Sequence, residues 1–595
     1  MKRRLYIAAV NNRYGRNVFL PLAAGLVWGH ASRRGLASEW QLPPGGTLYL
    51  KEPVDTALAR LEAPDLVAFS SYVWNHEWNK ALARAVKARW PRCLTLVGGV
   101  QVREGDGASL RAAGEFDLGV YGEGEGAFAD VLEALAGGGD LASVPSLLWR
   151  SGDGQVVANA RRAEVPLEEV PSPYLDGFFD EISSDGRWSY QALQESNRGC
   201  PYSCTFCAWG AASLSKLRQF PTERVVSEFE WMARHGVDLL YSCDANFGIL
   251  KRDLELAEAL VRVKERFGRP RQFRAAFAKN SNEAVLEISR CLARADMLKA
   301  TTLALQSMDD RVLGLVKRKN IKYERLADLS ARYEAAGIPT YAEVIVGLPG
   351  ETLRGFVGGL DALLDAGQHD GVSVYLCLLL ENTELASPES REAHGIVSAP
   401  LRAILYHGTP EPGAVEEVQE TVVGTALMPR ADLRRAVLYA WLLQALHALG
   451  LSQHLARRLR EKGTRYSALY EALLDRALAE PRGALGEEVG RLAAAWDLAE
   501  AGGPWDLVDE RFGDVMWPPE ELLFLRLACR SGEFYEELRR ALPEARELVD
   551  EQESVFQPPP SEREAWYARE AVWYGRKGPG ARLRSRPPGA GSRVA

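Results

Sequence analysis

The chain has 595 residues, of which 47% are hydrophobic and 26% are charged, and its formal net charge is −8 at pH 7. This length exceeds what one hydrophobic core supports and predicts several domains. The composition is typical of a soluble globular protein, and the acidic balance gives no general argument for nucleic-acid binding. We find neither a bilayer-spanning segment nor a full signal peptide, so we expect a cytoplasmic protein without a membrane partner.

Residues 1–140 alternate short apolar segments with amphipathic ones. The apolar segments predict β-strands at residues 4–10, 65–71, 93–99 and 116–122. The amphipathic segments predict helices at residues 18–33, 75–90 and 124–136. This alternation is typical of a doubly wound, Rossmann-like α/β domain, which binds ligands beyond the carboxyl ends of its parallel strands.

Three of these strands end in loops that are candidates for ligand binding. The candidate residues are Ser70, Ser71, Tyr72, Trp74 and Asn75 after the second strand, Gly98, Gly99, Val100 and Gln101 after the third, and Tyr121, Gly122, Glu123, Gly124 and Glu125 after the fourth. The glycines can equally mark ordinary tight turns. On these loops alone, the domain could bind a nucleotide.

Residues 141–188 are interpreted as a linker that contains a possible hairpin at 146–157, and a second strand–helix alternation fills residues 189–400. Its predicted strands are 189–196, 238–246, 272–278, 299–307, 340–347 and 371–380. Helical segments between them include 222–235, 253–267 and 322–336. Six such units predict a partial (β/α)6 barrel, with active residues at the carboxyl ends of the strands.

The strand signal fades beyond about residue 400. We expect a helical C-terminal domain over residues 401–555 with helical periodicity at 431–460, 464–479, 485–501, 519–531 and 533–552. Residues 556–595 are expected to be a tail. Its last twenty residues carry six basic side chains, no acids and many Pro and Gly, which indicates disorder.

Three of the eight cysteines, Cys200, Cys204 and Cys207, lie on one short segment directly after the first strand of the second alternation. Three thiolates on one loop can hold three corners of a cubane iron–sulfur cluster and leave the fourth iron open to a small molecule. A zinc loop is the alternative, but structural zinc has four ligands. The next Cys or His residues, His235 and Cys243, are not spaced to complete such a site.

This C-x-x-x-C-x-x-C motif, with Phe206 before the third cysteine, resembles that of the radical S-adenosylmethionine (SAM) superfamily. The resemblance implies that the open iron binds the amino and carboxylate groups of SAM and cleaves it to a 5′-deoxyadenosyl radical. Residues 1–400 further resemble cobalamin-dependent radical SAM methylases, including the carbapenem-side-chain and cystobactamid types. The phrases that carry this likeness are SYVWN, LVGG, YGEGE, CDANFGI, LQSMD, KRKNI, EVIVGLPGET and ENTELASPE.

The resemblance implies that the three N-terminal loops hold methylcobalamin. The motif D-x-H-x-x-G is absent, so we expect no histidine on cobalt, and a side chain such as Trp74 would cover its lower face. Trp74 can alternatively be a core or rim aromatic. The expected SAM contacts are Asp244, Asn246, Gln306, Ser307 and Glu343, although each can instead be a structural cap or a solvated polar residue. No general acid or base is implied.

The implied activity uses one SAM to methylate cobalamin and a second SAM to generate a substrate radical, which then takes the methyl group. We expect the methyl acceptor to be an unactivated carbon of a natural-product intermediate, free or carrier-bound, with a peptide as the second choice. Flavodoxin or ferredoxin would supply electrons. Three alternatives remain: a rearrangement or cyclisation, polar methylation of an aromatic carbon, and a cobalamin-binding redox sensor.

Overall fold

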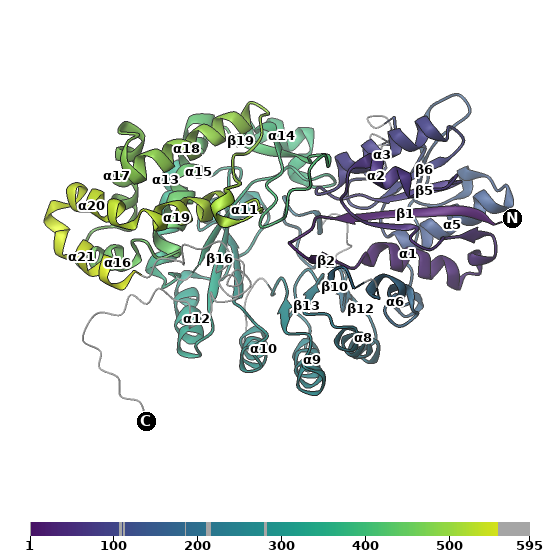
Figure 1. Cartoon of the computed structure of the whole chain (residues 1–595), viewed down its shortest axis with the longest axis horizontal. Helices are drawn as coiled ribbons and strands as arrows, with labels where there is room; N and C mark the ends of the chain where they lie inside the picture. Colours follow the sequence, from purple (N-terminus) through teal and green to yellow (C-terminus); the bar gives the residue numbers. More distant parts are fainter. Residues whose placement is uncertain are drawn as a thin grey trace.

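In the computed structural model, the described residues are 2–105, 107, 110, 114–184, 186–209, 216–278, 283–369 and 371–556. Figure 1 shows three parts along the long axis. The purple and blue N-terminal sheet lies at the right, teal barrel elements lie below the centre, and green and yellow helices lie at the left. The α/β class with a helical C-terminal part, expected from the sequence, is confirmed.

The first part is a sheet of eight strands in the order β3-β1-β5-β6-β7-β8-β9, with β4 also pairing β1. The strands are β1 (Arg3–Asn11), β3 (Trp40–Gln41), β4 (Thr47–Leu50), β5 (Leu66–Ser70), β6 (Leu94–Gly98), β7 (Leu118–Val120), β8 (Leu147–Arg150) and β9 (Val156–Ala158). The four predicted strands β1, β5, β6 and β7 are confirmed, and β1, β5, β6 and β7 run parallel.

Helices cover both faces of this sheet. They are α1 (Leu22–Arg33), α2 (Val54–Ala59), α3 (His76–Arg89) and α5 (Gly124–Gly137). Successive residues of a strand point to opposite faces. In β5, Phe69 accordingly packs in one core with Trp78 of α3, whereas Leu66 packs in a second core with Phe128 of α5. Burial on both faces explains why these strands are continuously apolar in sequence.

Two features of the N-terminal region correct the sequence predictions. The helix expected at 18–33 begins only at Leu22, after Pro21, and residues Asn17–Phe19 form β2, which pairs in parallel with the first barrel strand. Further along, β8 and β9 form the expected hairpin, but it pairs with β7 and extends the first sheet. The segment interpreted as a linker from residue 141 therefore begins inside the first domain.

The six predicted barrel strands are all present, and β2 adds a seventh. They are β10 (Ser189–Gln194), β13 (Leu239–Ser242), β14 (Gln272–Arg274), β15 (Thr301–Gln306), β16 (Thr340–Val346) and β17 (Val372–Leu376). Short strands β11 (Asn197–Arg198) and β12 (Arg218–Gln219) pair beside them. The helices of this part are α6 (Phe178–Ser183), α8 (Thr222–Arg234), α9 (Asp253–Phe267), α10 (Glu283–Arg294), α11 (Asp310–Leu315), α12 (Tyr323–Ala335) and α13 (Leu353–Asp365).

The barrel wall consists of two parallel sheets, β14-β13-β10-β2 and β15-β16-β17. Each sheet has its own core. The first packs against α8 and α9, and the second shares one continuous core with the C-terminal helices. In β16, Ala342, Val344 and Val346 are buried outward, whereas Tyr341, Glu343 and Ile345 are only half-buried. This alternation places the second set on the inner face of the wall.

The C-terminal part is mostly helical, and it also contains a strand hairpin that the sequence analysis missed. Its elements are α14 (Pro388–His394), β18 (Val397–Arg402), β19 (Val418–Gly424), α15 (Arg430–Leu443), α16 (Gln453–Glu461), α17 (Tyr466–Ala479), α18 (Gly483–Glu500), α19 (Pro519–Cys529), α20 (Ser531–Ala541) and α21 (Arg546–Val555). None of the described helices is long and apolar enough to cross a membrane.

Two of the expected C-terminal helices are each divided. The segment 431–460 contains α15, a π-helical turn at Gln444–Ala448 and α16, because Gly450 adopts a φ of +96°. The segment 533–552 is interrupted before Pro543, which cannot continue the hydrogen-bond pattern of a helix. Apart from Phe556, the expected tail 556–595 lies outside the described residues.

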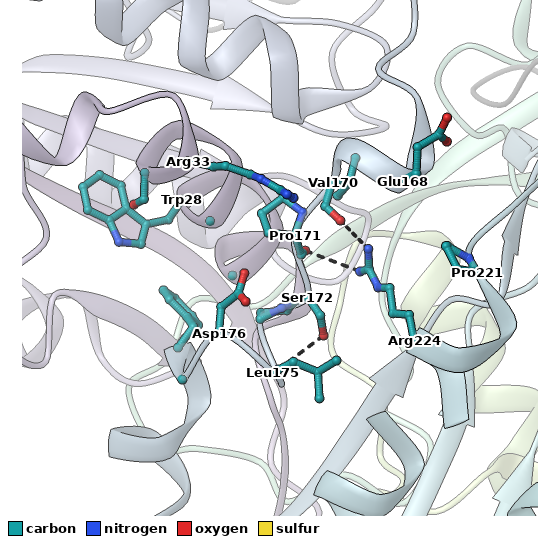
Figure 2. Close-up of a pocket in the computed structure, with 16 residues that line it drawn as sticks. Trp28, Arg33, Glu168, Val170, Pro171, Ser172, Leu175, Asp176, Pro221 and Arg224 are labelled. Carbon is teal, nitrogen blue, oxygen red and sulfur yellow. Dashed lines mark hydrogen bonds between the residues drawn. The ribbon is translucent and has the colours of Figure 1, made fainter. Parts of the chain in front are cut away.

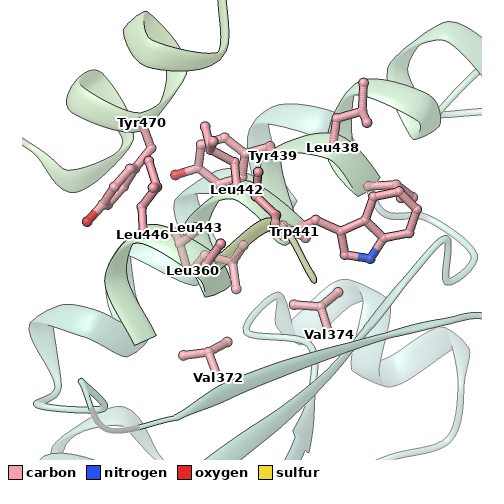
Figure 3. Close-up of a cluster of buried hydrophobic side chains, with 14 of the residues drawn as sticks. Leu360, Val372, Val374, Leu438, Tyr439, Trp441, Leu442, Leu443, Leu446 and Tyr470 are labelled. Carbon is pink, nitrogen blue, oxygen red and sulfur yellow. The ribbon is translucent and has the colours of Figure 1, made fainter. Parts of the chain in front are cut away.

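Helix α15 packs its apolar side chains directly over the barrel wall. Figure 3 shows Leu442 and Leu443 of this helix above Val372 and Val374 of β17, with Tyr470 of α17 beside them. Helical packing on the outside of a barrel strand buries both surfaces from water and is the main source of stabilisation at such a seam. The C-terminal helices and the β15–β17 wall thus form one packed unit.

A chain of buried polar side chains crosses the same seam. His369 Nδ1 lies 3.0 Å from His447 Nε2, and His447 Nδ1 lies 2.8 Å from the Tyr470 hydroxyl. Gln453 Nε2 donates to the carbonyl of His369 at 2.8 Å. Burial lowers the pKa of His369 to about 3 and places the pKa of His447 well below its ordinary value. Both imidazoles are therefore neutral in the folded protein.

We predict that this histidine pair makes stability depend on pH. The unfolded chain protonates both imidazoles below about pH 6.5 and the folded chain does not, so their contribution is complete above that pH and is lost as pH falls toward 3. For one imidazole the slope is at most about 1.4 kcal/mol per pH unit. Apparent Tm measured from pH 8 to 5 should fall less steeply in His369→Asn than in the wild type. The matched control is His394→Asn, and an equal change of slope in both variants would contradict the assignment.

Candidate functional site

The three-cysteine loop begins directly after β11. Cys200 and Cys204 are buried and Cys207 is half-buried, and all three are free thiols. The Cys207 N–H donates to the Cys204 carbonyl at 3.1 Å. Within the described part of the chain, no three Cys, His, Asp or Glu side chains converge as metal ligands do. The three thiols therefore lie on one loop, but their sulfur atoms do not converge on a common point.

The cysteine loop is attached to the barrel by backbone hydrogen bonds. Thr205 N donates to the carbonyl of Val316 at 3.1 Å, and Thr205 O accepts from Leu385 N at 2.9 Å. Phe206, the aromatic residue of the motif, packs against the core that contains the second barrel sheet. The middle of the loop is consequently held between the end of α11 and the turn Glu384–Ala386.

Asp244, an expected SAM contact, instead anchors the start of the cysteine loop. Its carboxylate accepts from Ser196 N at 2.8 Å, from Ser196 Oγ at 2.5 Å and from Asn197 N at 3.1 Å. Burial raises the pKa of Asp244 to about 7, although these hydrogen bonds oppose the rise. These bonds occupy both carboxylate oxygens. The geometry thus favours the structural alternative for this residue.

The other expected SAM contacts fall into two groups. Ser307 Oγ donates to Glu351 at 2.8 Å and accepts from Asp309 N at 3.1 Å, so it belongs to the turn after β15. Asn246 donates from Nδ2 to Cys200 Sγ at 3.3 Å, while its buried Oδ1 has no partner among the described residues. An unsatisfied buried amide oxygen is costly unless a ligand completes it. Asn246 therefore fits a contact to a molecule bound at the cysteine loop.

The side chains of Gln306 and Glu343 also have no hydrogen-bond partner among the described residues. Gln306, at the end of β15, is buried and has a φ of +69°, a strained backbone for a residue other than glycine. Glu343 lies on the inner face of β16, and burial raises its pKa to about 7 against the opposing charge of Arg318. Glu343 therefore lies on the inner face of the wall, and Gln306 lies at the carboxyl end of the neighbouring strand.

The first loop of the N-terminal domain presents an aromatic surface. The rings of Tyr72 and Trp74 stack with centroids 4.4 Å apart and planes 10° apart, and Trp74 is 38% exposed. Asn75 determines the shape of this loop, because its Nδ2 donates to the carbonyls of Val10 and Ser70 at 3.0 Å. Burial, together with the nearby Glu195 carboxylate, raises the pKa of Tyr72 to about 12.

The second loop packs closely against the first. Gly99 has a φ of +102°, and a Cβ at this position would lie 2.7 Å from the carbonyl oxygen of Ser71. Only glycine fits there. Asn382, which follows β17, donates from Nδ2 to the carbonyls of Val100 and Val102 at 2.9 and 3.0 Å. The segment after the second barrel sheet thereby holds this loop in place, and the loop also contains Gly98 and Gln101.

The third loop is joined to the cysteine loop by ion pairs that the sequence analysis missed. Arg198, two residues before Cys200, donates to Glu125 at 2.6 Å and to Glu195 at 2.8 Å, and it lies 3.4 Å from Glu123. Its side chain is 11% exposed. Burial opposes ionisation of Glu125, but the charge of Arg198 outweighs it and holds the pKa of Glu125 below its ordinary value. The two loop carboxylates thus contact protein rather than remain free.

The remaining residues of the third loop have local roles. Tyr121 donates its hydroxyl to the carbonyl of Asn159, Gly122 has a φ of +77°, and Gly124 begins α5. Arg218 pairs with Glu123 and, at 3.0 Å, with Glu164. The only sequence signal for these arginines is their position beside the cysteine motif.

The first loop is also contacted from outside its domain, by a residue of the C-terminal hairpin. Glu417 accepts from Lys51 Nζ at 2.7 Å and from the first backbone N–H groups of α3, Glu77 N at 2.7 Å and Trp78 N at 3.1 Å. Lys51 also donates to the carbonyl of Trp74 at 3.3 Å. A carboxylate at a helix N-terminus is stabilised by the unpaired N–H groups there.

A separate cavity of about 800 Å³ lies between α1, α6 and the start of α8. Figure 2 shows Trp28 and Arg33 on one side and Arg224 on the other, with Asp176 between them. Arg224 donates to the carbonyls of Val170 and Pro171. None of the predicted site residues lines this cavity.

Comparisons with known proteins agree with the two-part site. The model of the radical SAM superfamily matches residues 195–363, and the model of the B12 binding domain matches residues 51–132. The chain is 39% identical over 493 residues to the cobalamin-dependent radical SAM methyltransferase TokK of Streptomyces tokunonensis. The alignment covers 81% of this chain and 71% of that relative. The chain belongs to the cobalamin-dependent radical SAM methyltransferases.

A second relative and two solved structures extend the comparison. The methyltransferase shares 39% identity over 479 residues with 2-(S-pantetheinyl)-carbapenam-3-carboxylate methyltransferase of Streptantibioticus cattleyicolor, covering 79% of this chain and 69% of that one. OxsB aligns with a TM-score of 0.56 at 14% identity over 96% of this chain and 84% of its own. TsrM from Kitasatospora setae aligns with a TM-score of 0.54 at 17% identity over 73% and 91%. These two structures share the fold.

The family membership confirms three expected cofactors of this methyltransferase: a [4Fe-4S] cluster, SAM and cobalamin. The chain's own residues fit them. Three thiols share one loop, Asn246 Oδ1 is buried without a partner among the described residues, and Gly99 allows the second N-terminal loop to pack on the backbone of Ser71 in the first. Which residues contact which cofactor stays a prediction, as does the expectation that no histidine binds cobalt.

We predict that Arg198→Gln destabilises the contact between the two cofactor domains of this methyltransferase. The substitution leaves buried carboxylates without a counter-charge, which typically costs about 3–5 kcal/mol. Apparent Tm and cobalamin retention on gel filtration should both fall. Arg234→Gln is the control, because its ion pair with Glu230 is 55% exposed at the arginine and is worth at most about 1 kcal/mol. Equal losses in both variants would refute a special role for Arg198.

Proposed function

We propose that this methyltransferase transfers a methyl group from SAM, by way of methylcobalamin, to an sp³ carbon of a small natural-product intermediate through a substrate radical. The observation that carries the proposal is the ion-pair connection between the third cobalamin-domain loop and the residue two positions before Cys200. When bound, the cluster and SAM supply a hydrogen-abstracting radical, and cobalamin supplies the methyl group. The protein supplies relative position.

In this proposal the chain's residues have distinct tasks. Cys200, Cys204 and Cys207 hold the cluster, and Asn246 orients both Cys200 and the bound SAM through its two amide atoms. Gln306 and Glu343 bound the SAM site from the second barrel sheet. The stacked pair Tyr72 and Trp74 offers a flat apolar surface of the kind that covers a cobalamin face. The loop Gly98–Gln101 and residues Tyr121–Glu125 form the rest of that crevice.

The proposed substrate is a small molecule, free or carrier-bound, and the proposed electron donor is flavodoxin or ferredoxin in the cytoplasm. One relative acts, by its name, on a pantetheinyl carbapenam carboxylate, and we extend the class of natural-product intermediates to this chain. The tyrosines that line the barrel supply both flat apolar surface and hydroxyl donors. Such a surface suits a ligand with mixed polar and apolar groups.

The structure favours the radical route over polar methylation at one point. A carboxylate bound to the open iron would exclude SAM from it, and Glu195 is the nearest carboxylate in sequence. Both Glu195 oxygens instead accept from Arg198, at 3.3 and 3.1 Å from Nε and 2.8 Å from Nη2. The engagement of Glu195 by Arg198 supports the radical route, because it occupies the carboxylate that would be the first candidate to bind the open iron.

We predict that replacing Cys200, Cys204 and Cys207 together by Ala abolishes the iron–sulfur absorbance and the formation of 5′-deoxyadenosine. The reason is that the loop provides every thiolate of the cluster. The control variant, Cys291→Ala with Cys529→Ala, removes two thiols from helices α10 and α19 and should keep both signals. A complete cluster in the triple variant would overturn the assignment.

We predict that a substrate deuterated at the methylated carbon passes deuterium to 5′-deoxyadenosine. Hydrogen abstraction by the adenosyl radical precedes methyl transfer in the proposed route, and each methylation should also yield S-adenosylhomocysteine. Mass spectrometry of both nucleoside products checks this. Methylated product without deoxyadenosine would establish the polar route, and deoxyadenosine without S-adenosylhomocysteine would establish a rearrangement. Formation of neither nucleoside would support a sensor.

A further inference from the structure

The inner face of the barrel carries a row of large polar side chains around an internal space. Strand register aligns Leu193 with Tyr241 and Tyr241 with Arg274 across β10, β13 and β14. Tyr241 is 36% exposed, and Tyr375 on the opposite sheet is 41% exposed. Burial nevertheless raises the pKa of both phenols. Register and exposure place both phenols on the inner face of the barrel wall.

Two cations in this row have no counter-ion. Arg274 is exposed and Lys299, just before β15, is half-buried, and neither makes a hydrogen bond or ion pair within the described residues. Burial and the charge of Arg274 lower the pKa of Lys299 to about 8, so the two groups are close enough to repel. They lie on the facing edges of the two barrel sheets, where β14 and β15 share no ladder.

Neutral donors surround these cations. The charge of Arg274 acts on the phenols of Tyr14, Tyr241 and Tyr341. Glu343, the carboxylate on the inner face of β16, is influenced by Arg318 instead. A pair of like charges, one of them half-buried, is unfavourable unless an anion joins it. Guanidinium, ammonium and phenol groups are all donors, and together they match the oxygens of a carboxylate or phosphate.

We propose that Arg274 and Lys299 bind a carboxylate or phosphate group of the substrate within the barrel. This proposal rests on the proposed function, because it assigns the substrate an anionic end. Arg274 pairs with Tyr241, one residue before the paired residues Gln194 and Ser242 that end β10 and β13. Strand β10 leads to the cysteine loop, and β13 leads to Asp244. An anion held there directs the remainder of the substrate toward the cofactors.

The test uses the holoenzyme and two probes, acetate and inorganic phosphate. Lys299, with its lowered pKa, should react readily with an amine acetylating reagent, and peptide mass spectrometry measures its labelling. We expect at least one probe to protect Lys299 from labelling. The probe that gives half-protection at the lower concentration shows whether the site prefers a carboxylate or a phosphate. Arg274→Gln should raise that concentration about ten- to hundred-fold, since a charged hydrogen-bond donor is lost.

Two further variants keep the result interpretable. Arg271→Gln changes a neighbouring arginine whose guanidinium instead pairs with Asp238 at 3.3 Å, so protection should be unchanged. Lys299→Arg keeps the charge and should bind the probe, as measured by calorimetry, within a few-fold of the wild type. The anion site is overturned if neither anion reduces the labelling of Lys299, or if Arg274→Gln leaves the protection unchanged. Cluster absorbance and deoxyadenosine formation in the same preparations report separately on the proposed function.

Discussion

The buried guanidinium of Arg198 is the contact on which the arrangement of the two cofactor domains depends. It meets carboxylates from the first domain, Glu123 and Glu125, and from its own strand end, Glu195. Carboxylates removed from water are stable only when a cation offsets their charge. Any separation of the domains would take Glu123 and Glu125 away from Arg198. The cysteine loop, two residues away, is therefore held at one position relative to the cobalamin crevice.

The other two loops of the first domain are held in the same way by different parts of the chain. Asn382 of the barrel bonds the carbonyls of the second loop, and Glu417 of the C-terminal hairpin caps the helix after the first. Each contact satisfies backbone groups that strand ends and helix starts leave unpaired. Radical methylation asks for fixed distances between several groups rather than for an acid or base. Three polar contacts to three loops meet that requirement.

Periodicity in the sequence was sufficient for the central parallel strands of both α/β parts, because local patterns record burial on one or two faces, but it missed β4 and the hairpin of β18 and β19. It failed where the partner is distant. Residues Asn17–Phe19 look like the start of a helix, yet they pair with β10, about 170 residues away. Likewise, Glu123 and Glu125 look free in sequence, and only the fold reveals Arg198 between them. The cysteine motif was recognisable because all of its ligands are local.

The polar residues of the site differ in whether their polar atoms are already bonded within the protein or remain available to a ligand. Asp244, Ser307 and Asn75 have their polar atoms engaged by neighbouring backbone or side chains, and so they shape loops. Asn246 keeps a buried oxygen without a described partner, and Arg274 and Lys299 keep positive charges without one. A buried polar group without a partner is costly, and Asn246 is one of several such groups in the described part of the chain, distinguished by its place beside the cysteine loop. The proposed anion site lies on the inner face of the same barrel wall, so both sets of groups belong to one proposed binding region.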